Sequence, residues 1–266
     1  MPELPEVEYF KKIFSRVLKK KIADVVYHTP SLLKKTTPKK FSDLVIGRSF
    51  TSVVRKGKFL IAKLSGTENY VVLHFGMTGW LEYKKQTDFD DTDKRFGQII
   101  FALPGGYSLL LLDKRKFAKV YVVRDINEIK TLQKMGVDAL TISAKDFFAL
   151  LDKKKSRAIK AVLMDQALIA GIGNEYSNEI LYQAKINPAR KCGALTLSEQ
   201  KKIYTKMRAL LRKAVSFGGV QKLPPSWLLY HIKISRDMRC PDNKMHLLKR
   251  KTIGGRSAIY CPIDQK

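Results

Sequence analysis

The hydrophobic pattern changes from strand-like to helical near the middle of the chain, and this change limits the folds open to it. After a helical pattern over residues 3–20, short β-rich runs recur, separated by turns such as Pro104-Gly105-Gly106. The runs are Ile22–Tyr27, Phe50–Val54, Phe59–Leu64, Tyr70–Phe75, Gln98–Leu103 and Phe117–Val123. Short strands at regular spacing are typical of a sandwich or barrel.

The second half of the sequence has helical periodicity. From about Asn127 onward the predicted helices are Ser143–Leu151, Arg157–Met164, Asn174–Ala184 and Leu197–Val215. Thr196 followed three residues later by Glu199 is a capping-box signature for the longest of them. After Gly218-Gly219 the chain is basic and rich in Gly, Pro and β-branched residues, which favours a small hairpin module. The acidic stretch from Asp88 to Asp93 is interpreted as a solvated loop between strands. The pattern therefore predicts an α+β protein.

Charge indicates the partner. The 266 residues include 51 Lys plus Arg against 24 Asp plus Glu, a formal net charge of +27, yet 45% of them are hydrophobic. A chain this apolar can bury a core, so the charge belongs to a folded protein that binds a polyanion. Membrane binding is disfavoured because the apolar run Leu109–Leu112 is far shorter than the roughly 18 residues of a spanning helix. Three cysteines do not make a disulfide framework and indicate a reducing, intracellular environment.

The first residues carry unusual chemistry. Pro2 follows the initiator Met1, and Glu3 and Glu6 come directly after it. Removal of Met1, which a small second residue favours, would leave a secondary amine. An α-amino group has a pKa of about 7.7–8.0, so part of it is a neutral nucleophile at physiological pH. An adjacent acid can protonate a leaving oxygen. The structural alternative is that Pro and early acids simply begin a helix well.

Two further segments have both a binding and a structural interpretation. Gly171-Ile172-Gly173-Asn174 precedes a predicted helix, where backbone amides and the helix dipole can hold a phosphate, although most glycine-rich turns only connect elements. Residues 249–257 read Lys-Arg-Lys-Thr-Ile-Gly-Gly-Arg-Ser, and the two glycines predict a hairpin tip that carries Arg256. Such a tip can clamp a phosphate or be a solvated basic turn.

These pieces, in this order, resemble the formamidopyrimidine-DNA glycosylase and endonuclease VIII family of base-excision repair enzymes. The resemblance spans nearly the whole chain, through motifs that begin at Pro2, Arg55, His74, Asp113, Met164, Gly171 and Gly255. It implies a two-layered β-sandwich, a helix-two-turns-helix domain and a C-terminal β-hairpin finger. The expected domains are residues 1–126, the catalytic sandwich with its opening helix; 127–219, the DNA-binding helical domain; and 220–266, the finger.

The resemblance also implies a bifunctional enzyme, a DNA-formamidopyrimidine glycosylase with DNA-(apurinic or apyrimidinic site) lyase activity. Pro2 would attack the sugar carbon and form a Schiff base, Glu3 would protonate the ring oxygen, and Glu6 would help to order the site. Lys58 would orient groups at the lesion and contact phosphate, and Arg256 would complete the catalytic set. Elimination at both sides of the sugar, β and then δ, would cut the strand.

For DNA contacts, the resemblance assigns Met77 and Phe117 to the space left by an extruded nucleotide. His74, Asn174 and Arg256 would hold the flanking phosphates. Taken alone, Met77, Phe117 and His74 have a simpler interpretation as core residues. Lys116 stands where bacterial formamidopyrimidine-DNA glycosylases usually have an arginine that reads the opposite base. Because lysine lacks the bidentate fork, the opposite-base preference is expected to be looser.

Two more departures limit the resemblance. Many members close the finger around zinc with two Cys-x-x-Cys pairs, but here only Cys240 and Cys261 remain, with Asn243 and Asp264 at the other positions. Zinc is therefore not expected, and the finger would resemble the zincless fingers of the family; His246 is the alternative ligand that keeps a metal site open. The segment Phe217–Tyr230 also looks too short for a loop that covers 8-oxoguanine, which favours formamidopyrimidine lesions and leaves oxidised pyrimidines possible.

The predicted partner is double-stranded DNA containing oxidised bases or abasic sites, bound by a monomer without membrane contact. In a bacterium the protein would be cytoplasmic or associated with the nucleoid. Two other classes remain as alternatives: a non-catalytic DNA-binding protein with the same fold and charge, and a basic RNA-binding or ribosome-associated protein. The latter explains the charge but not the N-terminal acids.

Overall fold

A computed structural model describes residues 1–218, 223–235 and 238–266. Contacts between Cα atoms divide the chain into two compact units. The first unit comprises Met1–Pro2 and Glu6–Gln133, and the second comprises Glu3–Pro5 and Lys134–Lys266. The predicted domain boundary after residue 219 lies outside the described residues, as does part of the segment Phe217–Tyr230.

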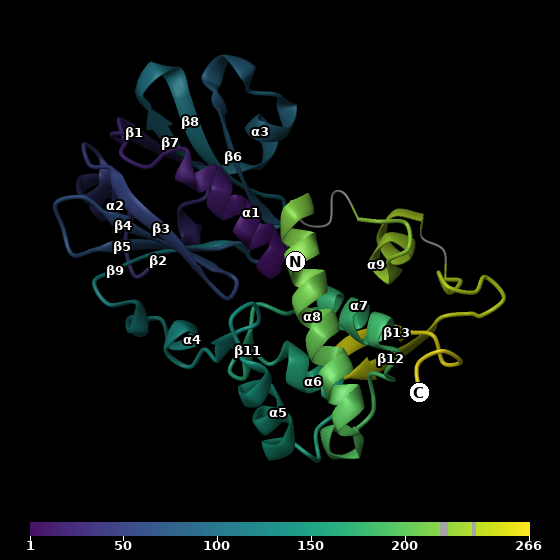
Figure 1. The fold of residues 1–266 in the computed structure, drawn as a ribbon. Helices are drawn as coiled ribbons and strands as arrows, with labels where there is room; N and C mark the ends of the chain where they lie inside the picture. The colour runs from purple at the N-terminus through teal and green to yellow at the C-terminus, as the bar shows by residue number, and fades with distance from the viewer. Residues whose placement is uncertain (219–222, 236–237) are drawn as a thin grey trace. The chain divides into compact units, whose positions relative to one another are not determined.

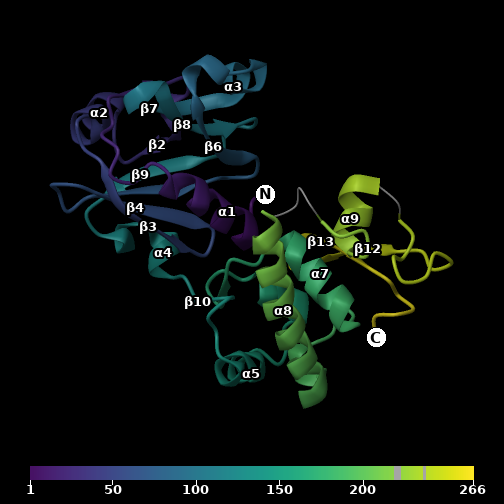
Figure 2. The same ribbon diagram turned by 45° about the horizontal axis from the view of Figure 1, so that its top comes forward.

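Two β-sheets form the layers of the first unit (Figure 2). One has the order β1 (Asp24–Tyr27), β7 (Gly97–Leu103), β8 (Tyr107–Asp113), β6 (Gly79–Lys85). The other has the order β2 (Leu33–Lys34), β9 (Lys119–Val123), β5 (Tyr70–His74), β4 (Phe59–Leu64), β3 (Phe50–Lys56). All neighbouring strands are antiparallel except β2 and β9. Besides helix α1 (Leu4–Ser15), this unit contains the shorter α-helices α2 (Pro38–Val45), α3 (Asp91–Phe96) and α4 (Lys130–Gln133).

Helix α1 (Leu4–Ser15) packs its apolar face into the core of the first unit. Phe10 contacts Phe75, with ring centroids 4.7 Å apart, and Phe14 contacts Phe50 at 4.8 Å. Burial of each aromatic side chain stabilises the fold by about 1.5–3 kcal/mol. This packing fixes the helix that directly follows the N-terminal residues.

Strands β6 and β8 were not among the predicted strands. The leucines 109–112 of β8 do not alternate with polar residues, because both faces of this strand are covered. One face belongs to the main core, and Leu110 and Leu112 lie in a second cluster beneath Trp80 and Phe96. A continuous apolar run carries no period of two, so periodicity alone could not identify it as a strand.

The acidic stretch was predicted wrongly as a loop. Asp90 and Asp93 form a reciprocal capping box that begins helix α3. Asp93 is buried and forms an ion pair with Lys84, with 2.7 Å between the Lys84 Nζ and an Asp93 carboxylate oxygen. The stretch therefore begins a helix between two strands, with Asp93 buried and Asp88, Asp90 and Asp91 exposed.

Helices dominate the second unit: α5 (Ala144–Lys153), α6 (Ile159–Met164), α7 (Asn174–Ala184), α8 (Leu197–Phe217) and the short α9 (Leu228–Tyr230), followed by a π-helical turn (His231–Ser235). A two-stranded parallel ladder joins β10 (Val137–Asp138) to β11 (Ile169–Ala170). The long helix α8 runs beside α7 (Figure 1), and its predicted capping box, Thr196 with Glu199, is confirmed. These helices and the terminal hairpin confirm the predicted α+β class.

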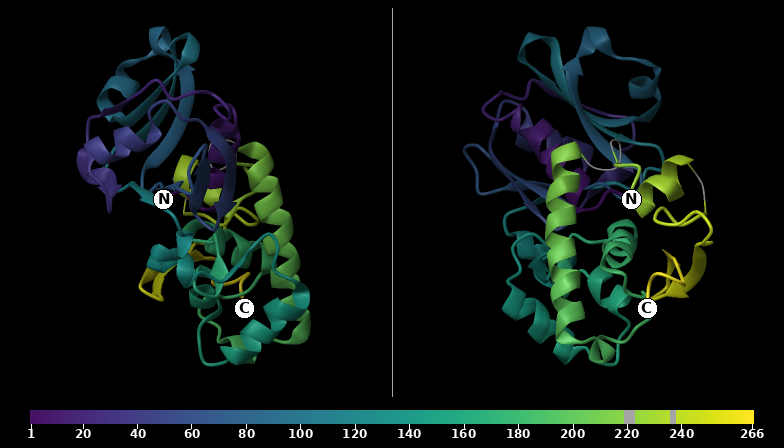
Figure 3. Two further views of the ribbon diagram at one scale, coloured as in Figure 1. Left: turned by 90° about the vertical axis from the view of Figure 1, so that its left-hand side faces the viewer. Right: turned by 45° about the vertical axis from the view of Figure 1, so that its right-hand side comes forward.

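The terminal hairpin consists of β12 (Lys249–Ile253) and β13 (Arg256–Tyr260), and it lies against α7 (Figure 3). Its turn needs glycine because Gly254 and Gly255 have φ values of 58° and 73°. A Cβ on Gly254 would also lie 3.0 Å from the Cβ of Ala161. The turn is therefore seated on helix α6.

Buried Glu179 gives the second unit a pH-dependent stability. Burial raises the pKa of Glu179 to about 7, although backbone N–H groups of Leu229 and Leu228 and the Gln183 side chain donate to it. Between its ordinary value of 4.5 and 7, the folded chain keeps a proton that the unfolded chain has lost. The free energy of unfolding therefore falls as pH rises through this window, by about 3 kcal/mol.

We expect Glu179→Gln, which stays neutral, to flatten this decline. Urea unfolding at the two ends of the window measures it, with the exposed Glu68→Gln as the matched control. An equally steep decline in wild type and Glu179→Gln would contradict the assignment.

Candidate active site

The N-terminal segment docks on the start of helix α7. Both carboxylate oxygens of Glu3 accept backbone N–H groups there: Gly173 at 2.5 Å, Glu175 at 2.9 Å and Tyr176 at 3.3 Å. The Glu3 side chain is buried. Three amide donors on two oxygens satisfy the acceptors of this buried carboxyl group at the N-terminus of the helix. The anion held by this glycine-rich loop is thus Glu3; a phosphate was one of the two interpretations of this segment.

Gly171 makes this docking possible. Its φ of +105° favours glycine, and a Cβ there would lie 2.9 Å from the Leu4 Cβ. The Leu4 N–H donates to the Gly171 carbonyl at 3.0 Å. The motif that precedes α7 therefore serves as the seat of Glu3 and Leu4.

Lys160 is a site residue that the sequence analysis missed. It is completely buried on α6, and its Nζ donates to Ser177 Oγ at 2.8 Å, Asn178 Oδ1 at 2.7 Å and the Asn174 carbonyl at 3.2 Å. Burial lowers the pKa of Lys160 to about 7, and the Glu3 carboxylate partly offsets this. A lysine inside the otherwise apolar run Ile159–Met164 was the only available signal.

Asn174 and Arg256 belong to the same unit. Asn174 is the first residue of α7, and its buried Oδ1 has no hydrogen-bond partner among the described residues. Buried amide oxygens are rarely left unpaired, so a water or ligand is expected there. Arg256 begins β13 directly after the glycine turn and is exposed. The Ile259 N–H donates to Asn178 Oδ1 at 3.4 Å, which fixes this strand on α7.

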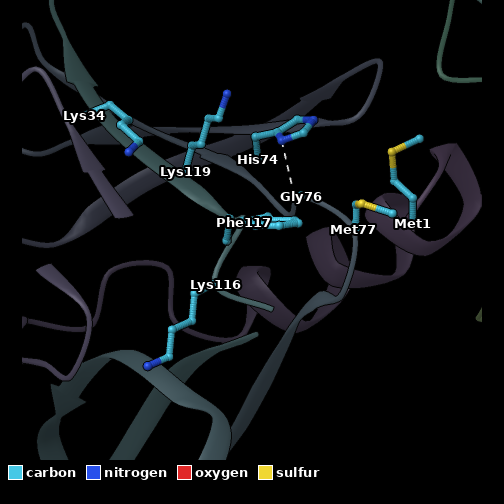
Figure 4. Close-up of a pocket in the computed structure, with 9 residues that line it drawn as sticks. Met1, Lys34, His74, Gly76, Met77, Lys116, Phe117 and Lys119 are labelled. Atoms are coloured by element: carbon cyan, nitrogen blue, oxygen red, sulfur yellow. Dashed lines mark hydrogen bonds between the residues drawn. The ribbon is translucent and has the colours of Figure 1, made fainter. Parts of the chain in front are cut away.

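The first unit contains a cavity of about 390 Å³ that gathers four predicted DNA contacts (Figure 4). His74, Met77, Lys116 and Phe117 line it, together with Met1, Lys34, Gly76, Ala118 and Lys119. Met77 and Phe117 are 42% and 48% exposed, so neither is the core residue of the structural alternative. Large apolar side chains therefore lie at the surface among lysines, which is the composition of a binding surface.

His74 is neutral in this cavity, and its tautomer is set. Burial lowers the pKa of His74 to about 4, and Lys119 and Lys58 add to the shift. The Gly76 N–H donates to His74 Nδ1 at 3.2 Å (Figure 4). The proton therefore lies on Nε2, which makes that nitrogen a hydrogen-bond donor at neutral pH.

Lys58 is buried in the turn between β3 and β4. An ion pair between Arg55 and Glu8 connects this turn to α1. Arg55 donates to Glu8 at 2.7 Å and to the Gly57 carbonyl at 3.0 Å. Burial alone would raise the pKa of Glu8, but hydrogen bonds from Lys11 and Arg55 lower it overall. Glu6 is also buried on α1. This network holds the Lys58 turn and the first helix in one geometry.

Asp113 shapes the loop that presents Lys116 and Phe117. One of its carboxylate oxygens accepts the Phe117 and Ala118 N–H groups, each at 2.7 Å. The other accepts the Thr78 hydroxyl at 2.6 Å and the Arg115 N–H at 3.1 Å. These bonds hold Lys116 at φ 58°, a left-handed conformation that costs a non-glycine residue about 1–2 kcal/mol. In Figure 4 the Lys116 side chain points away from the His74 ring.

Gly76 explains why this loop can approach the His74 motif. A Cβ on Gly76 would lie 2.5 Å from the Phe117 carbonyl carbon, and its φ is +57°. Only glycine satisfies both conditions. The two motifs lie about forty residues apart in the sequence. They form one surface because of this contact.

We expect Asp113→Asn to destabilise the first unit and displace Phe117. The amide can no longer accept at both oxygens, so two backbone N–H groups lose a partner, at a cost of about 1–3 kcal/mol in the free energy of unfolding. Urea unfolding and the affinity for abasic duplex DNA measure the two effects, with exposed Asp43→Asn as control. Unchanged stability and affinity would show that the loop does not depend on Asp113.

One cluster away from these groups has the donor atoms for a metal. Cys240, Cys261 and Asp264 place their ligand atoms within 4.8 Å of one another beside the terminal hairpin. All three cysteines of the chain are free and buried.

Comparison with known proteins agrees with this architecture. The model of the formamidopyrimidine-DNA glycosylase N-terminal domain matches residues 1–120, and that of the glycosylase H2TH domain matches residues 135–223. A formamidopyrimidine-DNA glycosylase from Listeria monocytogenes is 34% identical over an alignment of 288 positions, which covers 100% of both chains. One from Thermus thermophilus is 31% identical over 100% of this chain and 98% of its own.

Solved structures show the same fold. The complex between Lactococcus lactis Fpg and DNA containing an abasic site matches with a TM-score of 0.83 and 23% identity over 99% of both chains. A complex of the same protein with DNA containing an oxidised pyrimidine matches with a TM-score of 0.84 and 24% identity over 100% of both chains.

The fold and its matched domains define a DNA glycosylase of base-excision repair. The chain belongs to the formamidopyrimidine-DNA glycosylase family. Members of this family combine glycosylase and abasic-site lyase activity. Among the described residues, no helix is both long and apolar enough to cross a membrane.

Proposed function

We propose that this chain removes oxidised bases, formamidopyrimidine purines above all, through a Schiff base formed by Pro2. The observation that carries the proposal is the cavity of the first unit, where Met1 stands beside Met77, Phe117 and His74. Met1 is 40% exposed and takes no part in the core. Its removal would make the Pro2 imino nitrogen the first atom of the chain beside this cavity.

The reaction we propose begins at the sugar. The Pro2 nitrogen attacks C1′, Glu3 delivers a proton to the ring oxygen as the ring opens, and the damaged base leaves with its bonding electrons. The resulting iminium acidifies the neighbouring carbon. Loss of that proton expels the 3′ phosphate, and a second elimination expels the 5′ phosphate. One covalent intermediate thus accounts for both base removal and strand cleavage.

The surrounding residues are proposed to hold the distorted DNA. Met77 and Phe117 fill the space of the extruded nucleotide, at a site where unstacking costs a few kcal/mol. The Nε2 of neutral His74 donates to a phosphate, while Asn174 and Arg256 hold others. Lys58 orients groups at the lesion, and Glu6 orders the N-terminal residues. Residues 1–126, 127–219 and 220–266 then act as catalytic domain, helix-two-turns-helix domain and finger of a monomer.

The preference for the opposite base depends on Lys116, and the preference for the lesion depends on the segment after α8. Lys116 offers a point charge instead of a bidentate fork, so we propose a loose preference for the opposite base. The short segment after α8 favours formamidopyrimidines over 8-oxoguanine. The substrate is intracellular DNA, in the nucleoid where the host is bacterial.

An excision panel tests the proposal. One duplex carries formamidopyrimidine, 8-oxoguanine, an oxidised pyrimidine or an abasic site in turn, and chain cleavage and borohydride trapping are measured for each. We expect trapping on all cleaved substrates and fastest release of formamidopyrimidine. Salt-sensitive binding without cleavage or trapping would instead identify a non-catalytic DNA-binding protein, and tighter binding to structured RNA than to abasic DNA would identify an RNA-binding protein.

A further inference from the structure

Helix α8 carries a basic surface that the proposed reaction does not use. Its residues include one acid, Glu199, which lies in the first turn and forms an ion pair with Arg190. The left view of Figure 3 shows α8 along one edge of the second unit. After its first turn the charged residues of the helix are all cations: Lys201, Lys202, Lys206, Arg208, Arg212 and Lys213.

The helical repeat sorts these cations into two rows. At about 100° per residue, one row consists of Lys201, Arg208 and Arg212, and the other of Lys202, Lys206 and Lys213. Between the rows lie three small exposed residues, Thr205, Ala209 and Ser216. Together they form a basic strip that covers roughly 160° of the helix surface.

The apolar side of α8 is occupied by the core of the second unit. A basic helix that lies on a membrane surface must insert its apolar face, and this face is here inside the protein. The basic strip therefore points away from α7, whose first residue, Asn174, is proposed to hold the damaged DNA. The buried residues of α8 are Ile203, Met207, Leu210, Leu211 and Ala214.

The cations of the basic strip form no ion pair with any described residue. Arg208 donates to the Ile142 carbonyl at 3.0 Å, which fixes this side chain against the protein. The Nζ of Lys213 lies 5.8 Å from the centroid of the Phe217 ring. Lys201, Lys202 and Arg212 are exposed.

The acids of the adjacent helix α5 have other partners. Asp146 accepts the Ser143 hydroxyl at 2.6 Å. Asp152 forms an ion pair with Lys155, with 2.7 Å between the charged atoms. Within the described part of the chain, the positive charge of the basic strip is thus left without a counter-charge.

We propose that the basic strip of α8 binds the phosphate backbone of a second segment of duplex DNA while the first segment occupies the proposed active site. From Lys201 to Lys213 the helix rises by about 18 Å, and a duplex carries one negative charge per about 1.7 Å of its axis. A regular polyanion therefore presents roughly ten charges to the six cations.

The composition of the strip favours a duplex over an unpaired strand. It contains no aromatic side chain on which an exposed base could stack, and its small central residues offer no groups that read base edges in a groove. Binding is therefore expected to be independent of sequence and steeply dependent on salt. A protein that holds two segments at once can pass from one to the other during its search for damage.

A ternary complex tests the second site without using activity. The full-length protein is first saturated with a short duplex that carries an uncleavable abasic analogue and a donor dye. A second, undamaged duplex with an acceptor dye is then titrated at low salt. We expect energy transfer between the dyes, a sedimenting species of one chain with two duplexes, and a dissociation constant on the order of 10⁻⁶ M or weaker.

Combined variants separate the strip from the general charge of the protein. Lys202→Ala, Lys206→Ala and Lys213→Ala together should weaken binding of the second duplex at least about 10-fold and reduce the slope of log affinity against log salt by about 3. Lys201→Ala with Arg212→Ala should reduce the slope by about 2. Alanine keeps the helix intact, and urea unfolding verifies this.

The matched control removes three exposed lysines of the first unit, through Lys39→Ala, Lys40→Ala and Lys94→Ala. It lowers the net charge equally and should leave binding of the second duplex within about 2-fold of wild type. Both triple variants should bind the abasic analogue as wild type does.

Three results would overturn the proposal. The first is a saturated wild-type complex that binds no second duplex at low salt, and the second is equal loss in the α8 variant and the control. The third is tighter binding of structured RNA than of duplex DNA through the same lysines, which would identify an RNA site. Because the analogue is not cut and Pro2 takes no part, failure of the second site would leave the proposed repair reaction untouched.

Discussion

A chain that keeps an uncleaved extension before Pro2 should bind DNA normally and yet fail to cut it. The extension converts the Pro2 nitrogen into an amide, which has no free electron pair for attack on the sugar. We expect cleavage at a lesion to fall by roughly 10³-fold or more, the scale of losing a covalent nucleophile. Borohydride should trap no adduct.

The control is the same preparation after the extension is removed, so that Pro2 becomes the first residue. Its adduct should map to Pro2 by mass spectrometry, and its rate of formation should rise with pH toward about 8 as the amine loses its proton. Equal cleavage by the extended and trimmed proteins would exclude Pro2 as the nucleophile. Affinity for an uncleavable abasic analogue verifies that both forms bind.

Glu3→Gln should separate base removal from strand cleavage. Without the acid, protonation of the ring oxygen is lost, and we expect excision of a damaged base to slow by about 10²–10⁴-fold. A pre-formed abasic site exists partly as an open aldehyde and needs no such proton. Cleavage of abasic DNA should therefore decline much less than excision, and single-turnover rates on the two substrates measure the difference.

The same substitution has a structural effect that must be measured alongside. The amide cannot accept from all of Gly173, Glu175 and Tyr176, so the free energy of unfolding should fall by about 1–3 kcal/mol. Glu68→Gln, which removes an exposed carboxylate, serves as control. If excision and abasic cleavage decline equally while the protein stays folded, Glu3 acts only as the cap of α7.

Much of the fold could be predicted from local pattern. The strand Phe59–Leu64 and the helix Asn174–Ala184 have the predicted bounds, and the capping box at Thr196 begins the longest helix. Each depends on neighbours a few residues away, which periodicity and capping report directly. Strand β8 was not predicted because it is buried on both faces, and a uniform apolar run is compatible with either a strand or a helix.

Of the site, the sequence determined the chemistry available: an imino terminus behind Met1, carboxylates after it, and cations for a polyanion. It also brought out His74, Met77, Lys116 and Phe117, which line one cavity. Only the tertiary structure decided how the groups are used. In the folded chain the backbone N–H groups at the start of α7 donate to Glu3, and buried Lys160 donates to three acceptors. His246 and Asp264 lie beside the thiols of Cys240 and Cys261. The physical reason is range: these contacts join residues far apart along the chain, where burial and hydrogen bonding select partners that local pattern cannot report.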